Sequence, residues 1–200
     1  MPDEQRYPSN PGDHDGGAPE FVLERPTLMD GQAIYDLVCR AGLDVNSPYA
    51  YVLWCRDFAA TTVVARGRTA SGAETSPELG GFVLGYVRPE QPDTYFLWQV
   101  AVDPGYQGRK LARTMLHHIG DRCVRQGIRY LEATVTPDNA ASRALFEAFA
   151  RAHGVEARWS PLFERAHFPQ PEAVTDVDQG HEREELVRIG PLHTSIAASS

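Results

Sequence analysis

The amino-acid sequence predicts a mixed α/β domain in which helices flank a central sheet of about six to seven strands. Short runs rich in β-branched and aromatic residues alternate with segments whose apolar residues recur at helical spacing. One apolar run, residues 95–102, is almost continuous, which is typical of a buried strand in the middle of a sheet. With 200 residues, 42% hydrophobic and 23% charged, the chain has the size and composition of one globular domain.

The first half of this domain is predicted to contain two helices and four strands. A helix follows Asp30, a plausible N-cap, because apolar residues there recur at helical spacing until Gly42 ends the pattern. Pro48 behind Ser47 predicts a second helix that reaches about residue 58, since proline is favoured at the first helical position. The expected strands cover residues 21–25, 61–65, 79–87 and 95–102.

The second half adds two helices and three strands. A long helix is predicted at residues 107–126, where Leu111, Met115 and Ile119 share one face. A further helix follows a turn that ends at Asn139. The expected strands cover residues 129–135, 156–159 and 185–189.

The two ends of the chain lack the patterns of folded structure. Residues 1–20 have no apolar periodicity, so we expect a disordered tail, and we expect a flexible tail at residues 191–200 around a domain at 21–190. The N-terminus has no apolar segment of the secretory type, and no run approaches the 18 to 20 apolar residues of a membrane helix. We therefore expect a cytoplasmic protein without a membrane partner.

Charge and cysteine usage exclude further classes. A net charge of −8 argues against a nucleic-acid partner, which requires a basic surface. Cys39, Cys55 and Cys123 are odd in number and far apart, and no CxxC pair occurs. We therefore expect neither a disulfide framework nor a metal site, and interpret each cysteine as a small apolar residue.

Residues 100–112 (VAVDPGYQGRKLA) carry the strongest functional signal. A buried strand ends, and a loop of small and polar residues opens a long helix. Amides at a helix N-terminus point outward with partial positive charge, so such a loop can bind a pyrophosphate without a metal. Glycine-containing turns of this kind are common, and the spacing matches neither the Rossmann fingerprint nor the P-loop.

This pattern resembles the acetyl-CoA motif of the GNAT acetyltransferase superfamily, in which a strand ending Val-Ala-Val is followed by Q/R-x-x-G-x-G/A. Residues 137–142 (PDNAAS) resemble the adjoining motif. Lys110 departs from the pattern, because it stands where the motif usually has glycine; we expect it to be helical, since a left-handed backbone would cost lysine about 1 kcal/mol. The resemblance implies acetyl-CoA as co-substrate, with contacts from Val100, Ala101, Val102, Gln107, Gly108, Arg109, Lys110, Leu111, Ala112 and Asn139.

Four further stretches resemble one family within that superfamily, the diaminobutyrate acetyltransferases. They are LDVNSPY at 43–49, FLWQVAV at 96–102, LEATVTPDN at 131–139, and HERE at 181–184 with RIGP at 188–191. This resemblance implies transfer of the acetyl group of acetyl-CoA to the 4-amino group of L-2,4-diaminobutyrate, a step of ectoine synthesis. It also implies a homodimer.

The acceptor amine must lose a proton before it attacks the thioester, and a carboxylate or a water held by one can accept that proton. We expect Asp44 and Glu132 in this catalytic and amine-binding role, with Trp98 packed against the aliphatic chain and over the cation. A carboxylate inside a strand, as at Glu132, is unusual. The family resemblance adds substrate contacts from Asn46, Tyr49, His181 and Glu182.

Each of these residues also has a purely structural interpretation. Asp44 suits a turn, Trp98 suits a core, Glu182 lies in a charged run, and Asn139 suits a helix cap. Phe146 stands where many GNAT enzymes have the tyrosine that reprotonates the thiolate, so we assign no general acid. The alternatives left open are a GNAT enzyme for another small amine and a CoA-binding module without turnover.

Overall fold

The computed structural model describes residues 21–68, 75–168 and 182–193. Its helices are α1 (Asp30–Ala41), α2 (Pro48–Asp57), α3 (Leu111–Arg125) and α4 (Ala140–Ala152), with short 3-10 turns η1 (Ala59–Thr61), η2 (Pro104–Tyr106) and η3 (Arg165–His167). Its strands are β1 (Phe21–Glu24), β2 (Val63–Arg68), β3 (Thr75–Arg88), β4 (Gln91–Val102), β5 (Tyr130–Val135), β6 (Ala157–Phe163) and β7 (Glu184–Ile189).

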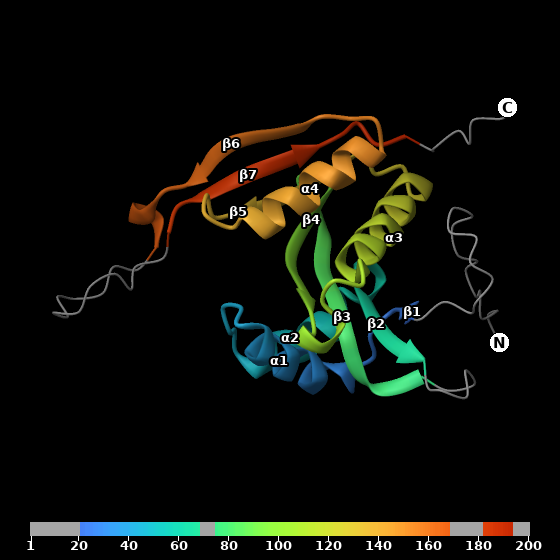
Figure 1. Cartoon of the computed structure of the whole chain (residues 1–200). Coiled ribbons are helices and arrows are strands. Elements are labelled where there is room, and N and C mark those ends of the chain that lie inside the picture. Colours follow the sequence, from blue (N-terminus) through green and yellow to red (C-terminus); the bar gives the residue numbers. More distant parts are fainter. Residues whose placement is uncertain (1–20, 69–74, 169–181, 194–200) are drawn as a thin grey trace, which may run out of the picture.

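All seven strands form one mixed sheet in the order β1-β2-β3-β4-β5-β7-β6. Strands β1 to β4 pair antiparallel in sequence order, β4 and β5 pair parallel, and β7 lies antiparallel between β5 and β6. The single parallel pair requires a crossover, which α3 provides, as Figure 1 shows. The predicted fold class and the predicted number of strands are thereby confirmed.

Helices cover the two faces of the sheet and bury two separate cores. Helices α3 and α4 cover one face, where Leu97, Met115 and Phe149 belong to a single buried cluster. Helices α1 and α2 cover the other face, where Ile34 and Phe82 belong to the second cluster (Figure 1). A strand buried on both faces has few polar positions, which explains the nearly continuous apolar run in β4.

Two helix starts differ from the sequence-based expectation. Helix α3 begins at Leu111, four residues after the predicted start, because residues 107–110 form a loop with two left-handed residues. Asp30 is inside the first turn of α1, and its carboxylate accepts from the backbone N–H and the hydroxyl of Thr27. Asp30 therefore accepts a hydrogen bond from the backbone N–H three residues before it, as the third helical residue of a capping box does.

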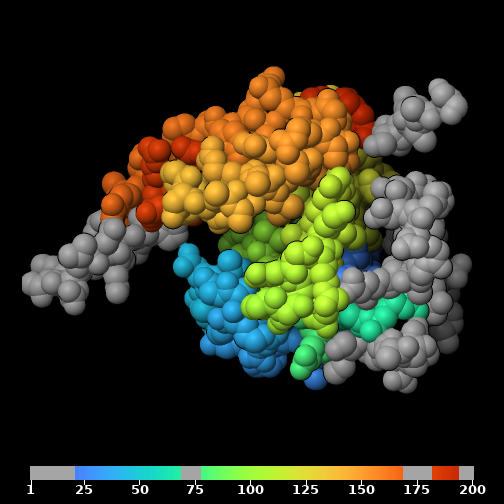
Figure 2. All heavy atoms as spheres, in the orientation of Figure 1, coloured from blue at the N-terminus to red at the C-terminus, as the bar shows by residue number. Residues whose placement is uncertain are grey.

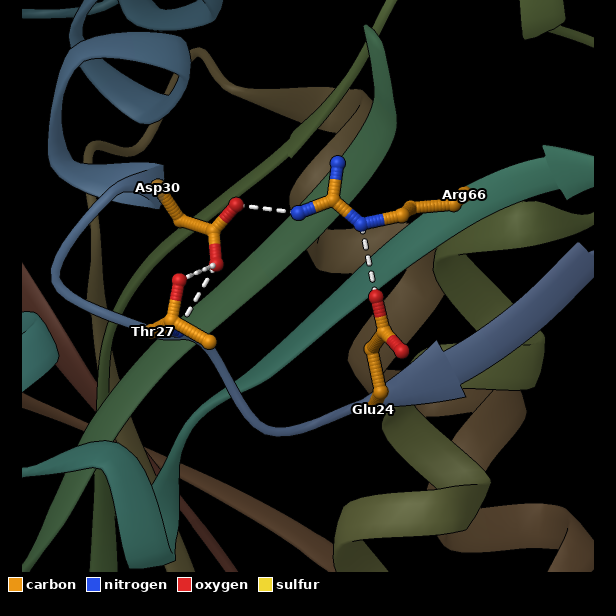
Figure 3. Close-up of polar contacts among 4 residues, drawn as sticks. All are labelled: Glu24, Thr27, Asp30 and Arg66. Atoms are coloured by element: carbon orange, nitrogen blue, oxygen red, sulfur yellow. Dashed lines mark hydrogen bonds and ion pairs between the residues drawn. The ribbon is translucent and has the colours of Figure 1, made fainter. Parts of the chain in front are cut away.

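Asp30 also takes part in an ion-pair network that joins β1, α1 and β2 (Figure 3). Arg66 of β2 binds Asp30 with one terminal nitrogen, and its Nε donates to Glu24 of β1 at 2.6 Å. Asp30 is buried and the Arg66 side chain is only 14% exposed, whereas Glu24 is 42% exposed. The network fixes the start of α1 against the sheet, and thereby the helix that leads into the 42–47 loop.

The packed region extends past the expected boundary at residue 190. Leu192 is buried in the core under α3 and α4, and its N–H donates to the carbonyl of Arg129 at 2.6 Å. The expectations for residues 1–20 and 194–200 lie outside the described residues. Among the helices that the structure describes, none has both the length and the apolar character needed to cross a membrane.

Candidate active site

The parallel strands β4 and β5 separate along their length. They pair from Thr94 and Tyr130 to Leu97 and Ala133, and their pairing ends there. β4 nevertheless continues to Val102 and β5 to Val135. A gap therefore opens between the carboxyl-terminal ends of two strands in the middle of the sheet. Beyond Leu97 and Ala133, no described residue of β5 pairs with β4.

The peptide groups that face this gap follow from the pairing on the other side of β4. The N–H of Asp103 donates to Gly80 of β3 at 2.9 Å, so this antiparallel pair is hydrogen-bonded. Hydrogen-bonded and non-hydrogen-bonded pairs alternate along the strand. The backbone N–H and C=O of Ala101 therefore point toward β3, whereas those of Val100 and Val102 point toward the gap. Of the three predicted β4 contacts, two therefore present free backbone groups and one, Ala101, does not.

A β-bulge at Trp98 sits at the point where the gap begins. Leu97 pairs with Gly85 and Gln99 with Leu84, so Trp98 is the extra residue on β4. Its ring stacks on Trp54 of α2, with centroids 4.3 Å apart and an interplanar angle of 23°. Trp98 is partly buried against the α1–α2 core, and it also lies where the gap begins. Its position therefore agrees both with a core residue and with a residue of the site.

The 107–110 loop leads from β4 into α3 at the same end of the sheet. Gly108 has φ 79° and Lys110 has φ 58°, so the expectation that Lys110 is helical is wrong. Lys110 adopts the left-handed conformation that the motif's usual glycine adopts without cost. The amides of Gly108, Lys110, Leu111 and Ala112 donate to no backbone carbonyl among the described residues. These amides lie at the N-terminus of a 15-residue helix, an arrangement that suits an anion; we call them the amide cradle.

Asn139 caps the second helix on this face. Its side-chain oxygen accepts from the N–H of Ser142 at 3.0 Å, and α4 starts at Ala140. The structural interpretation of Asn139 is therefore confirmed. Its cofactor contact stays a prediction, and the contact would have to use the side-chain nitrogen, which the cap leaves available.

The 42–47 loop lies against the β4 bulge. Gln99 donates from Nε2 to the backbone carbonyl of Asp44 at 3.1 Å, and the hydroxyl of Tyr51 accepts from the N–H of Asn46 at 3.2 Å. Asp44 is thus bound to Gln99, the residue that follows Trp98, although Asp44 and Trp98 are 54 positions apart in the sequence. Tyr49 is 70% exposed on α2. Figure 2 shows a recess between α1–α2 in blue and α4 in orange, floored by green atoms of the sheet.

Glu132 has partners that the sequence did not reveal. Its carboxylate is 3% exposed and binds two guanidiniums, with Arg88 Nη1 at 2.8 Å from Oε2 and Arg188 Nη1 on Oε1. Both oxygens are engaged, so the carboxylate is not a free base and not a free amine ligand. Arg188 is its register partner on β7, whereas Arg88 reaches it from β3 across the intervening strand β4, and no local sequence pattern reveals either pairing.

The remaining predicted residues are less closely placed. His181 lies outside the described residues, and Glu182 is exposed at a cavity of 270 Å³ lined also by Pro137, Arg165 and Arg183. This cavity lies where β7 begins, beyond the carboxyl end of β5. The described residues contain no group of three or more His, Cys, Asp and Glu side chains that could hold a metal.

Comparison with known proteins identifies the family of this chain. Residues 32–150 match the model of the acetyltransferase (GNAT) family. An L-2,4-diaminobutyric acid acetyltransferase of Streptomyces coelicolor is 45% identical over 86% of this chain and 94% of its own length. The protein of the same name from Nocardia farcinica is 42% identical over 88% of this chain and 82% of its own.

Solved structures agree in fold. The diaminobutyrate acetyltransferase EctA from Paenibacillus lautus, solved with its substrate L-2,4-diaminobutyric acid and coenzyme A, has a TM-score of 0.74 at 32% identity, covering 88% of this chain and 98% of its own. A ribosomal-protein-S18-alanine N-acetyltransferase from Escherichia coli, at 19% identity and a TM-score of 0.61, shares the fold alone. This chain belongs to the GNAT acetyltransferase family.

Proposed function

We propose that this member of the GNAT family transfers the acetyl group of acetyl-CoA to the 4-amino group of L-2,4-diaminobutyrate, the step of ectoine synthesis that yields N4-acetyl-L-2,4-diaminobutyrate. The observation that carries the proposal is the gap between β4 and β5, which begins at the bulge beside Asp44 and Trp98. Relatives that match nearly the whole length of the folded region are named diaminobutyrate acetyltransferases.

The backbone groups around the gap suit acetyl-CoA. The peptide groups of Val100 and Val102 have the spacing and direction to pair with the amides of a pantetheine arm, as an added strand would. The amides of residues 108–112 suit a pyrophosphate at the N-terminus of α3. The thioester then lies near Trp98, where an N–H of β4 can stabilise the charge that develops on its oxygen.

The side chains near the bulge suit the amine. In the proposed reaction the Asp44 carboxylate takes a proton from the 4-ammonium group, directly or through a water, and the neutral amine attacks the thioester carbon. The carbon–sulfur bond breaks and the amide bond forms, the attacking nitrogen releases its second proton to water, and the CoA thiolate takes a proton from water. No general acid is assigned, because Phe146 is buried in the core and has no proton to give.

Direct transfer between the two substrates also agrees with the state of the buried thiols. Burial raises the pKa of Cys55 to about 11 and that of Cys123 to about 12, so both are protonated at neutral pH. Neither is therefore a nucleophile that would carry the acetyl group as an intermediate.

The test is incubation with acetyl-CoA and L-2,4-diaminobutyrate, with the product located by NMR. The proposal expects one product, acetylated at the 4-amino group, together with one equivalent of CoA. Acetylation at the 2-amino group, or no product, would overturn it. From the resemblance to the family, we further propose that the protein is a cytoplasmic homodimer. Light scattering of the purified chain checks whether it is a dimer.

A further inference from the structure

Two arginines on the sheet face opposite α3 and α4 are held by one buried carboxylate. Arg88 and Arg188 each bind Glu132 through Nη1, and each side chain is still 34% exposed. The Arg188 guanidinium also stacks over the ring of Tyr130, with its carbon 3.9 Å from the ring centroid. Two cations and one anion leave a local charge of +1, on a chain whose net charge is −8.

Most of the guanidinium nitrogens remain available. Arg88 Nη1 donates both to Glu132 and to Gln91 at 3.1 Å, and Arg188 uses only Nη1 for Glu132. Among the described residues, no acceptor engages Nε or Nη2 of either arginine by hydrogen bond. A planar guanidinium that keeps two parallel N–H groups free is suited to a carboxylate, which it binds through two oxygens.

The position of these arginines relative to the gap suits the acceptor substrate. Glu132 immediately precedes Ala133, the last β5 residue that pairs with β4. Its register partner Phe96 is part of an aromatic surface that continues through Tyr86 and Trp54 to Trp98 at the bulge. The arginines and the bulge therefore lie along one face of the sheet, on the side where α1 and α2 pack.

We propose that Arg88 and Arg188 bind the α-carboxylate of the acceptor amino acid, and that Glu132 positions both guanidiniums instead of accepting the proton of the amine. This inference rests on the proposed function. With the 4-amino group at the gap, the carboxylate carbon lies four bonds away, roughly 5 Å for an extended chain with bonds of about 1.5 Å. The carboxylate then neutralises the local charge of +1.

The arrangement makes the two arginines specificity-determining residues. An amine without a carboxylate leaves both guanidiniums without their anion, so the site rejects it even when its reacting end is identical. The matched pair of substrates is L-2,4-diaminobutyrate and 1,3-diaminopropane, which has the same amine spacing and lacks only the carboxylate. The wild-type enzyme is expected to prefer diaminobutyrate strongly.

The experiment measures kcat and KM of wild type, Arg88→Met and Arg188→Met with both substrates. Each substitution is expected to lower kcat/KM for diaminobutyrate by about 100-fold, mainly through KM, because the contact is equal in ground and transition states. The value for 1,3-diaminopropane is expected to stay within threefold, roughly the span of an exposed charge change. This retained activity also shows that the variants are folded.

Two further variants complete the design. Arg158→Met removes the neighbouring arginine on β6, which is the register partner of Arg188, is 77% exposed and pairs with Glu156, and it is expected to change neither substrate. Glu132→Gln is expected to raise KM for diaminobutyrate alone. If Glu132→Gln lowers kcat equally for both substrates, Glu132 acts on the amine and the inference is overturned.

The remaining outcomes separate this inference from the proposed function. If wild type acetylates neither substrate, the proposed function fails. If wild type acetylates diaminobutyrate, but the arginine variants lose both substrates equally or neither, the function stands and the inference fails. The inference also fails if light scattering shows that the variants lose a dimer that wild type forms, since the arginines then bind a second copy.

Discussion

Leu97 of β4 and Ala133 of β5 are the last residues at which these parallel strands pair. Both strands continue beyond this point, and the extra residue Trp98 on β4 turns the strand away at the same level. An interrupted ladder in the middle of a sheet leaves strong hydrogen-bonding groups without protein partners, which would be unfavourable unless water or a ligand satisfied them. The interruption is therefore the structural basis of the proposed acetyl-CoA site.

Hydrogen exchange of individual β4 amides tests this account. The amides of Val100 and Val102 face the gap, whereas those of Gln99 and Ala101 already donate to β3. Saturating acetyl-CoA should slow exchange at Val100 and Val102 and leave Gln99 and Ala101 nearly unchanged. NMR exchange rates with and without acetyl-CoA provide the measurement. Equal protection of all four amides would mean that the ligand only stiffens the strand.

Substitutions in the 107–110 loop distinguish backbone contacts from side-chain contacts. Gly108→Val places a β-branched residue at φ 79°, which costs about 1 to 2 kcal/mol and shifts the amides, so the Kd for acetyl-CoA should rise about tenfold or more. Lys110→Gly keeps the left-handed backbone and removes one charge, so the Kd should rise only a few-fold, and less at high salt. Calorimetric titration at two salt concentrations measures both. A larger effect of Lys110→Gly at both salts would make the side chain the main anchor.

The sequence predicted most of the elements, because hydrophobic period is a local property. All seven strands and all four helices occur close to the expected residues, including β4, whose apolar run reflects burial on both faces. The start of α3 was misplaced because nothing local distinguishes Lys110 in a helix from Lys110 in a left-handed turn. The loop conformation overrides the residue's own preference there.

The site was predicted less completely than the fold, since its side-chain partners come from distant strands. Asp44 and Trp98 were chosen by resemblance, and the contact that brings them together runs through Gln99, which no sequence pattern singled out. The sequence alone does not reveal that the Glu132 carboxylate is paired, because its partners Arg88 and Arg188 are 44 and 56 positions away. Strand register places Arg188 beside Glu132, and the long side chain of Arg88 reaches the same carboxylate from β3, across β4.

Asp44→Asn tests the proposed proton acceptor without changing the shape of the side chain. Loss of the carboxylate should lower kcat/KM for diaminobutyrate by about 100-fold, the size expected for a charged contact in a closed site. The Kd for acetyl-CoA should stay the same, because the cradle and the gap are formed by other residues. Steady-state kinetics and calorimetry check the two halves. Weaker acetyl-CoA binding in this variant would assign Asp44 to the cofactor side.

Asp30 and Arg66 are expected to control stability more than activity. Asp30→Ala removes the buried carboxylate that binds Arg66 and the acceptor of the Thr27 amide, so it should cost about 2 to 3 kcal/mol of unfolding free energy, because Arg66 keeps Glu24. Glu24→Gln changes the 42% exposed end of the same network and should cost less than about 1 kcal/mol. Urea unfolding of the two variants measures the difference. Equal costs would show that burial does not decide the strength of this network.

The last prediction concerns acid and His118. Burial, and then the cations Arg122 and Arg125, lower the pKa of His118 from 6.5 to about 4 in the folded protein. The unfolded chain therefore binds a proton below about pH 6.5 that the folded chain does not bind until about pH 4, so stability falls as the pH drops through this window and is unaffected above it. The difference amounts to about 2 kcal/mol by pH 5.

His118→Gln is the matched variant, because the glutamine oxygen can still accept from Arg122, which donates to His118 Nε2 at 3.1 Å in the wild type. Urea unfolding at pH 8 should give similar free energies for the two proteins, while at pH 5 the wild type should have lost about 2 kcal/mol more than the variant. His117 and His153, whose pKa values burial also lowers, are present in both and cancel in the comparison. Parallel loss of stability in wild type and variant between pH 8 and pH 5 would show that His118 titrates alike in the folded and unfolded chains.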